Sequence, residues 1–77
     1  MMSRRDVSEI VRQWKNECHI THMILFSYKS GVLTICTDKP GIMIGYMGET
    51  VGKYNEILKS KDKNFKIVNF IETDGIV

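Results

Sequence analysis

The chain has 77 residues, the length of one small domain, and a domain of this size buries only about 60% of the surface that it exposes when unfolded. This leaves no room for separate substrate and cofactor domains within the chain. The composition, with 43% hydrophobic and 26% charged residues, is ordinary for a globular domain. The net charge of +2 is too small to identify a nucleic-acid partner by itself.

Targeting signals are not evident in the sequence. An amphipathic segment follows the first residues, where a signal peptide would have a continuous apolar region. The longest apolar run, residues 23–26, is far shorter than the roughly 20 residues that span a bilayer. Two cysteines, Cys18 and Cys36, are too few for a disulfide scaffold. We therefore expect a cytoplasmic protein with reduced thiols and no membrane association.

Residues 3–18 are predicted to form the first helix. Ser3 and Asp6 have the spacing of a capping box, with Asp in the place of the usual Glu or Gln. Apolar residues at spacings of three and four form one stripe along the helix. The members of this stripe are Val7, Ile10, Val11, Trp14 and Cys18.

A β-hairpin is predicted next. Residues 22–28 and 32–37 are rich in β-branched and aromatic side chains, and the Lys29-Ser30-Gly31 segment between them is typical of a tight turn. In the second strand Leu33 and Ile35 share one face. We expect this face to meet the core.

Two helices joined by a glycine-bounded link follow the hairpin. Pro40 ends the strand and suits the start of a helix, and residues 42–44 make one apolar turn that Gly45 stops. Helical spacing resumes after Gly48, with Glu49 at the positive end of the helix dipole. The stripe of this second helix consists of Val51, Tyr54, Ile57 and Leu58.

The remaining residues predict a polar loop over residues 59–64, a third strand over residues 65–71 and a frayed tail over residues 72–77. The element order is therefore α-β-β-α-α-β. We expect one α+β domain over residues 1–77, with its core between residues 3 and 71.

The Gly45-x-x-Gly48 link has two physical explanations. Glycine permits positive φ and the close approach of another chain, and a helix that begins at such a loop has unpaired N–H groups that attract an anion. The link can therefore hold a phosphate, or it can be a simple corner between two helices, which the spacing alone favours. A Walker loop is excluded, because Gly52-Lys53 is followed by Tyr54 where a Ser or Thr is required.

The segment Thr37-Asp38-Lys39-Pro40-Gly41-Ile42-Met43-Ile44-Gly45-Tyr46-Met47-Gly48-Glu49-Thr50-Val51 resembles the centre of a K-homology (KH) domain of type II, the form found in the bacterial ribosomal small-subunit protein. In that family a strand runs into Pro-Gly, a short apolar turn, the Gly-x-x-Gly loop and an acidic residue that opens the next helix. The resemblance covers residues 3–71. It implies three helices packed on a three-stranded mixed sheet, with about four nucleotides of single-stranded RNA or DNA beside the loop.

The resemblance also implies roles for individual residues. Gly45 and Gly48 would let the nucleic-acid backbone approach, while Ile44 and Val51 would line an apolar groove for the bases. Residues 60–64 would form the opposite wall of the groove. The basic residues expected to attract the backbone are Lys39 and Lys53 beside the loop, and Lys59, Lys61, Lys63 and Lys66 near that wall.

Tyr46 and Met47 occupy the two middle positions of the loop, where the family usually has polar residues and often Lys or Arg. A missing cation removes a phosphate contact, which Tyr46 can offset by stacking on a base. An exposed Tyr–Met pair is also typical of protein interfaces. The sequence thus predicts a module that binds single-stranded RNA, with DNA as an open alternative. A KH-like fold that binds a protein or joins a ribonucleoprotein assembly is the other alternative.

Metal binding and catalysis have weak support. Cys18-His19-x-x-His22 with Cys36 lacks the two close ligand pairs of a zinc site, and Cys18 completes an apolar stripe. A Cys–His dyad has no third residue to orient it. We therefore expect no metal, no other cofactor and no enzymatic activity.

Overall fold

The computed structural model describes residues 2–21 and 24–73. Its elements are α1 (Arg4–Glu17), β1 (Leu25–Lys29), β2 (Val32–Thr37), α2 (Pro40–Ile44), the 3-10 turn η1 (Tyr46–Gly48), α3 (Glu49–Lys61) and β3 (Ile67–Glu72). This order agrees with the predicted α-β-β-α-α-β arrangement. The α+β class is confirmed.

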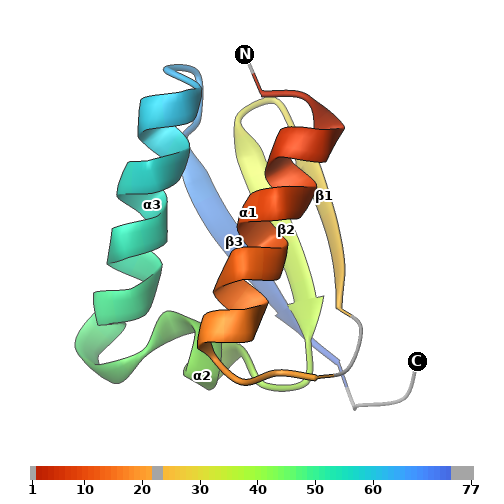
Figure 1. The fold of residues 1–77 in the computed structure, drawn as a ribbon, viewed down its shortest axis with the longest axis vertical. Helices are drawn as coiled ribbons and strands as arrows, with labels where there is room; N and C mark the ends of the chain where they lie inside the picture. Colours follow the sequence, from red (N-terminus) through yellow and green to blue (C-terminus); the bar gives the residue numbers. More distant parts are fainter. Residues whose placement is uncertain (1, 22–23, 74–77) are drawn as a thin grey trace.

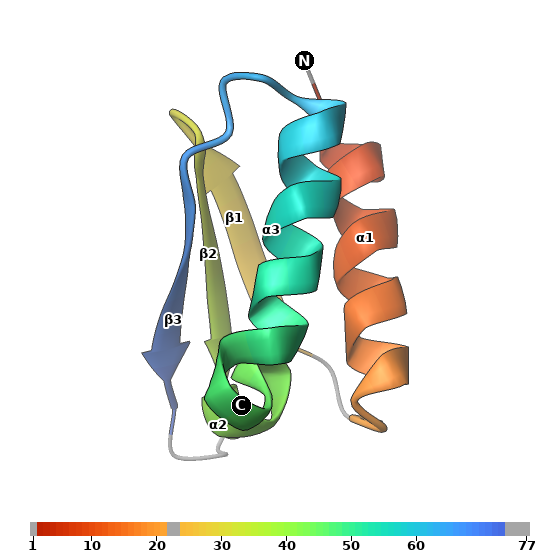
Figure 2. The same ribbon diagram turned by 90° about the vertical axis from the view of Figure 1, so that its left-hand side faces the viewer.

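The three strands form one mixed sheet in the order β1-β2-β3. β1 pairs antiparallel with β2, and β3 pairs parallel with β2. Parallel neighbours need a crossover connection, which α2 and α3 supply. Figure 1 shows α1 and α3 side by side on one face of the sheet, with α2 at the end where β2 finishes. The two layers are seen edge-on in Figure 2.

Two long helices cover the sheet, whereas α2 has only five residues. The face of the sheet away from α1 and α3 is uncovered in the described chain (Figure 2). Leu25, Ile67 and Ile71 are exposed on the strands. Leu33 and Ile35 are fully buried, as the alternation of β2 predicted.

The predicted capping box starts α1. The Asp6 amide donates to Ser3 Oγ at 3.2 Å, and the Ser3 amide donates to Asp6 Oδ2 at 3.1 Å. These bonds satisfy donors that the first helical turn leaves unpaired. Val7 and Trp14 are fully buried, so the predicted stripe faces the core.

The hairpin turns at Ser30 and Gly31, which both have positive φ, as a type I′ turn requires. Only glycine fits at position 31, because a Cβ there would lie 2.4 Å from the Asn64 carbonyl oxygen. The Gly31 carbonyl accepts a hydrogen bond from the Lys66 amide at 2.7 Å, which connects this turn to the start of β3. Of the predicted strand 22–28, residues 22 and 23 lie outside the described residues, and β1 begins at Leu25.

The predicted end of the second long helix was wrong. α3 continues to Lys61, through half of the predicted polar loop. Lys and Ser do not break a helix, and Lys side chains in the last turn interact favourably with the helix dipole. Asp62, predicted to lie in a solvated loop, is only 4% exposed.

The third strand also lies slightly later than predicted. Phe65 is buried, but its amide donates to the Asp62 carbonyl in a turn, and β3 begins at Ile67. Glu72 belongs to the strand, and the Thr73 amide continues the pairing by donating to the Thr37 carbonyl at 3.0 Å. The rest of the predicted tail, residues 74–77, lies outside the described residues.

Candidate nucleic-acid interface

The Gly45–Gly48 corner is a sharp reversal between α2 and α3. Gly45 has φ +82° and ends α2, Met47 has φ +53°, and Gly48 has φ +77° and precedes α3. A Cβ at position 45 would lie 2.4 Å from Thr50 Oγ1 and 2.9 Å from the Thr50 amide nitrogen. Gly45 is therefore required both by its backbone conformation and by the close approach of α3.

The amides of this corner are only partly free. The Gly45 amide donates to the Gly41 carbonyl at 3.0 Å, the Gly48 amide donates to the Gly45 carbonyl at 3.1 Å, and the Glu49 amide donates to the Tyr46 carbonyl. Fewer backbone N–H groups are therefore free at this corner than the sequence predicted. Within residues 2–21 and 24–73, the Tyr46 and Met47 amides have no acceptor.

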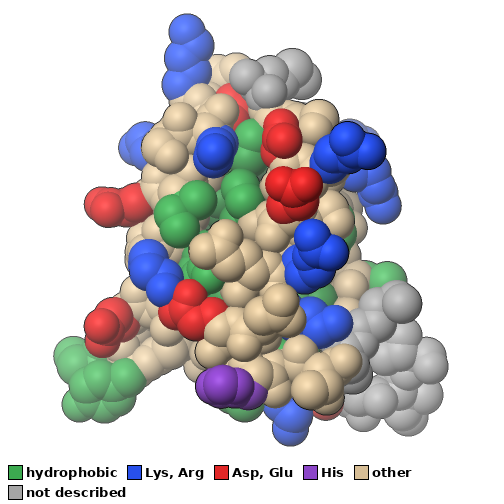
Figure 3. All heavy atoms as spheres, viewed as in Figure 1, with side chains coloured by type: hydrophobic (Ala, Val, Ile, Leu, Met, Phe, Trp, Pro, Cys, Tyr) green, Lys and Arg blue, Asp and Glu red, His purple; other side chains and the backbone are tan. Residues whose placement is uncertain are grey.

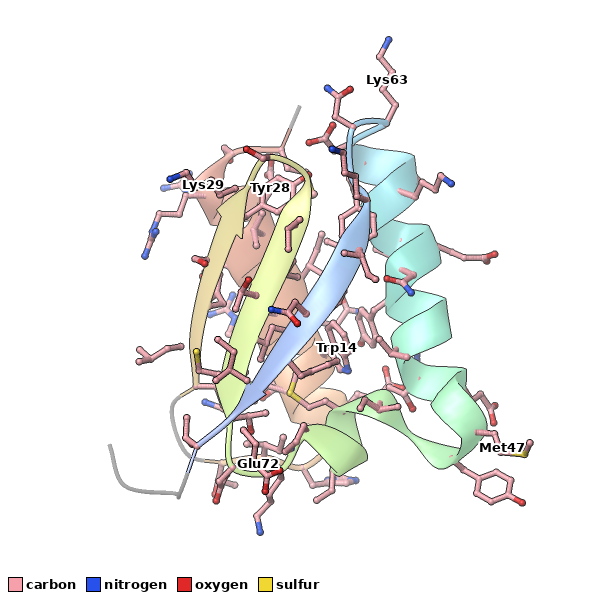
Figure 4. All side chains as sticks on the ribbon, turned by 180° about the vertical axis from the view of Figure 1, so that it is seen from behind. Trp14, Tyr28, Lys29, Met47, Lys63 and Glu72 are labelled. Carbon is pink, nitrogen blue, oxygen red and sulfur yellow. The ribbon has the colours of Figure 1, made fainter. Side chains whose placement is uncertain are left out.

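Tyr46 and Met47 form the tip of the corner. The two residues are 83% and 88% exposed, in agreement with the exposure expected for both. Figure 3 shows a hydrophobic protrusion at this corner, and Figure 4 shows Met47 directed away from the body of the protein. The loop therefore presents an apolar tip and two amides.

Ile44 and Val51 flank the tip, one at the end of α2 and the other in the first turn of α3. Both side chains are half-buried, and Val51 packs against the core. The methyl-bearing side chain of Val51 is the nearest group to a Cβ built at Gly48, at 3.9 Å. The structure thus brings both predicted groove residues next to the two loop glycines.

The predicted basic residues are not gathered at the corner. Lys39 is exposed at the start of α2. Lys53 forms an ion pair with Glu17 of α1, and its ammonium group lies 5.1 Å from the centre of the Tyr54 ring. Lys53 therefore has a structural partner close at hand, which the sequence did not reveal.

The other predicted lysines lie at the far end of α3. Lys59 and Lys61 are in its last turn, and Lys63 follows in the loop. A helix of 13 residues is about 20 Å long, so these side chains are remote from the loop. Figure 4 shows Lys63 and Met47 at opposite ends of the molecule. The resemblance assigns the opposite wall to residues 60–64, and the lysines near it lie about the length of α3 away from the Gly45–Gly48 loop.

Buried contacts from α1 hold the corner in place. The Trp14 indole Nε1 donates to the Met43 carbonyl at 3.0 Å, and the Cys18 thiol contacts the Ile42 carbonyl at 3.5 Å. These bonds satisfy two carbonyls of α2 that the helix itself leaves unpaired. Sequence reasoning assigned Trp14 to packing only. Its role in positioning α2 depends on a contact across 29 positions of the chain.

Glu17 is a second support that sequence reasoning missed. Its carboxylate accepts a hydrogen bond from the Tyr54 hydroxyl at 2.8 Å in addition to the contact with Lys53. The Lys53 contact, followed by the Tyr54 bond, lowers the pKa of Glu17. Burial, and then the bond to Glu17, raises the pKa of Tyr54. This cluster ties the end of α1 to the first half of α3.

Carboxylates as well as lysines lie at the end of the molecule that contains the corner. Glu17 ends α1, Glu49 begins α3, and Glu72 ends β3 on the same side of the molecule. Figure 4 shows Glu72 at this end, opposite Lys29 and Lys63. The loop therefore has no excess of positive charge around it to attract a polyanion.

The described residues give little support for a metal site or a reactive thiol. Among the described residues there is no group of three or more His, Cys, Asp or Glu that could hold a metal ion, and His22 lies outside them. Desolvation raises the pKa of the Cys18 thiol, which disfavours the reactive thiolate.

No helix in the described chain is long and apolar enough to cross a membrane. Comparison of the sequence and structure with protein-family models, curated proteins and solved structures found no match.

Proposed function

We propose that this chain is a KH-like module that binds single-stranded nucleic acid, RNA in preference to DNA, at the Gly45–Gly48 corner. The observation that carries the proposal is the pair of Tyr46 and Met47 amides, which have no acceptor in the described chain and lie between two glycines with positive φ. Backbone N–H groups in such a turn can bind a phosphate oxygen without a cationic side chain. The proposed action is binding, with no chemical step.

The contacts proposed for the ligand follow from the exposed groups. A phosphate would meet the two amides, and a base would stack on Tyr46, a residue that is 83% exposed. Stacking of this kind contributes about 1–3 kcal/mol per base. Ile44 and Val51 would contact the adjacent base with their half-buried side chains. Because cations are scarce at the corner, we expect weak binding with a shallow dependence on salt.

Changing the charge of the tip tests this proposal. Replacing both Tyr46 and Met47 by Asp would repel phosphate and should weaken binding of a random-sequence RNA at least about tenfold. Replacing both by Lys should strengthen binding and steepen the slope of log K against log salt by about 0.7 for each additional phosphate that the lysines neutralise. Both pairs of substitutions are at exposed positions, so folding should be retained. Fluorescence anisotropy at low and physiological salt measures these changes.

The matched control introduces two Asp residues away from the loop, as Ser27→Asp with Gln13→Asp. Both positions are exposed, one on β1 and one on α1. This control changes the net charge equally and should alter RNA affinity less than the loop pair. Equal binding by the loop variants, the control and the wild type would overturn the proposal.

The apolar tip and its neighbouring carboxylates favour a second candidate, a KH-like fold that binds a protein. Large exposed Tyr and Met side chains are enriched at protein interfaces. In that case Tyr46→Ala with Met47→Ala should abolish capture of a protein partner. The Lys pair should then give no increase in RNA affinity. The response to the Lys pair therefore distinguishes the two candidates.

A further inference from the structure

A cavity of about 720 Å³ lies at the opposite end of the molecule from the Gly45–Gly48 corner. It is open to solvent and bounded by the start of α1, the β1–β2 turn and the loop between α3 and β3, which Figure 1 shows together at one end. Its volume falls within the range of about 300–1,000 Å³ that is typical of small-molecule sites. Three segments far apart in the sequence thus form one concave surface.

The lining of the cavity is cationic. Arg4, Lys63 and Lys66 contribute to it, and all three side chains are exposed. Within the part of the chain that the structure describes, no ion pair involves any of them, in contrast to Lys53 at the other end. Figure 4 shows Lys29 in the same half of the molecule as Lys63 but on its other side, where it adds to the positive potential of this end.

One carboxylate faces the cavity, but it is already engaged. Asp62 is buried, and its oxygens accept hydrogen bonds from the Tyr28 hydroxyl at 2.8 Å and the Asn64 amide at 2.9 Å. These bonds hold Asp62 in the ionised form and below the surface. The three cations outnumber this single negative charge, so the cavity attracts anions.

The inner wall of the cavity is apolar and aromatic. Phe65 and Met2 are buried in it, and Phe26 and Tyr28 are half-buried. The Arg4 guanidinium lies 5.6 Å from the centre of the Phe26 ring, so a cation and an aromatic surface are adjacent. An aromatic ring carrying a negatively charged group suits this combination, because the ring can pack on the wall while the charge stays at the rim.

We propose that this cavity binds a nucleoside 5′-phosphate, either as a free nucleotide or as the 5′-phosphorylated end of a strand. The phosphate would meet Arg4, Lys63 and Lys66, because guanidinium and ammonium groups form charge-assisted hydrogen bonds with phosphate oxygens. The base would pack against the half-buried rings of Phe26 and Tyr28. This site is separate from the Gly45–Gly48 corner, and its occupancy does not depend on the function proposed for that corner.

An NMR titration of the labelled protein tests the proposal. Adenosine 5′-monophosphate should shift the amide signals of Gly31, Asn64 and Lys66, which line the cavity. Adenosine without phosphate should produce no saturable shift there. Lys63→Gln with Lys66→Gln should weaken binding at least about tenfold, because two charge-assisted hydrogen bonds to the phosphate are removed. Arg12→Gln with Lys15→Gln removes the same charge from α1, at two positions that do not line the cavity, and should leave binding unchanged.

A second arm distinguishes the two sources of the phosphate. A 5′-phosphorylated RNA tetramer is compared with the same tetramer bearing a 5′-hydroxyl. Shifts at the cavity with the mononucleotide support a site for free nucleotides, and shifts only with the phosphorylated tetramer support a site for a strand end. No cavity shift with either ligand overturns the proposal, as does equal binding by the Lys63/Lys66 variant. Because the tip residues are monitored in the same spectra, the proposal for the loop succeeds or fails separately.

Discussion

Gly45 is the residue at which the corner tolerates change least. We predict that Gly45→Ala destabilises the protein by about 1–3 kcal/mol. A Cβ would be held at φ +82° and would lie within 3 Å of both the side chain and the backbone of Thr50. Because a backbone atom is involved, rotation of the Thr50 side chain cannot relieve the contact. Urea unfolding followed by circular dichroism measures the change.

Gly52 provides the matched control for this prediction. It lies within α3, and a Cβ built there meets nothing within 4 Å. Gly52→Ala should therefore stabilise the protein by about 0.5–1 kcal/mol, since alanine loses less backbone entropy on forming a helix. The same substitution is thus expected to have opposite effects at two nearby positions. A destabilised Gly52→Ala variant, or an unaffected Gly45→Ala variant, would contradict this interpretation of the corner.

At the scale of the elements, Trp14 is the side chain that joins most of the fold. Its ring stacks on Tyr54 of α3 at 4.7 Å with an interplanar angle of 6°, and it meets Phe70 of β3 edge-on at 5.8 Å. Its Nε1 donates to the Met43 carbonyl of α2. One residue of α1 therefore contacts α2, α3 and β3.

We predict that Trp14→Phe lowers stability by about 2–4 kcal/mol. The smaller ring leaves a cavity, and the Met43 carbonyl loses its buried donor. Tyr54→Phe is the control, because it keeps the stacked ring and removes only the hydrogen bond to Glu17, for an expected cost of about 0.5–1.5 kcal/mol. Trp14 is the only tryptophan, so Trp14→Phe removes the fluorescence signal of unfolding. Urea unfolding is therefore followed by circular dichroism for both variants. Equal losses would show that the Trp14 contacts matter no more than the Glu17 bond.

The elements differ in how far the sequence alone could predict them. α1 was predicted well because its signals are local: the capping box and the stripe lie within the helix itself. The end of α3 was predicted too early because Lys59, Ser60 and Lys61 are polar residues that suit either a loop or a final helical turn. β3 was placed too early because Phe65 is buried by a turn rather than by the sheet.

The candidate site was predictable only in its local part. Gly45-Tyr46-Met47-Gly48 is contiguous, so its exposed tip followed from the sequence. The internal hydrogen bonds of the Gly48 and Glu49 amides depend on a tight 3-10 turn, which glycine spacing does not specify. The partners of Lys53 and the distance of Lys63 from the loop depend on how α1 and α3 pack. No local pattern contains that information.

Charge is unevenly distributed over the whole molecule. Arg4, Lys29, Lys63 and Lys66 lie at the end that contains the cavity, whereas Glu17, Glu49 and Glu72 lie at the end that contains the corner. The end that contains the cavity therefore carries an excess of positive charge, whereas carboxylates and lysines are mixed at the end that contains the corner, where Lys53 pairs with Glu17. A polyanion should first approach the basic end, because electrostatic attraction dominates the early stage of association.

Carboxylates also connect separate parts of the whole molecule. A hydrogen bond from the Ser3 amide lowers the pKa of Asp6 at the start of α1, and the Lys53 contact lowers that of Glu17 between α1 and α3. Bonds from the Asn64 amide and the Tyr28 hydroxyl lower the pKa of Asp62, which connects β1 with the loop before β3. Each carboxylate thus binds its proton less readily in the folded state than in the unfolded state.

We predict that acid destabilises the protein, because protonation of these three carboxylates removes the contacts that they make in the folded state. A carboxylate whose pKa is lower in the folded state contributes stability that is fully present above about pH 5 and is lost as the pH falls through its folded-state pKa. The urea midpoint should therefore be lower at pH 3 than at pH 7. The variant Asp6→Asn, Glu17→Gln, Asp62→Asn should start from a lower midpoint at pH 7 and lose less of it on acidification, since its three amides do not titrate. If the variant loses as much as the wild type between these pH values, the acid sensitivity has its origin in other groups, and these three contacts do not govern it.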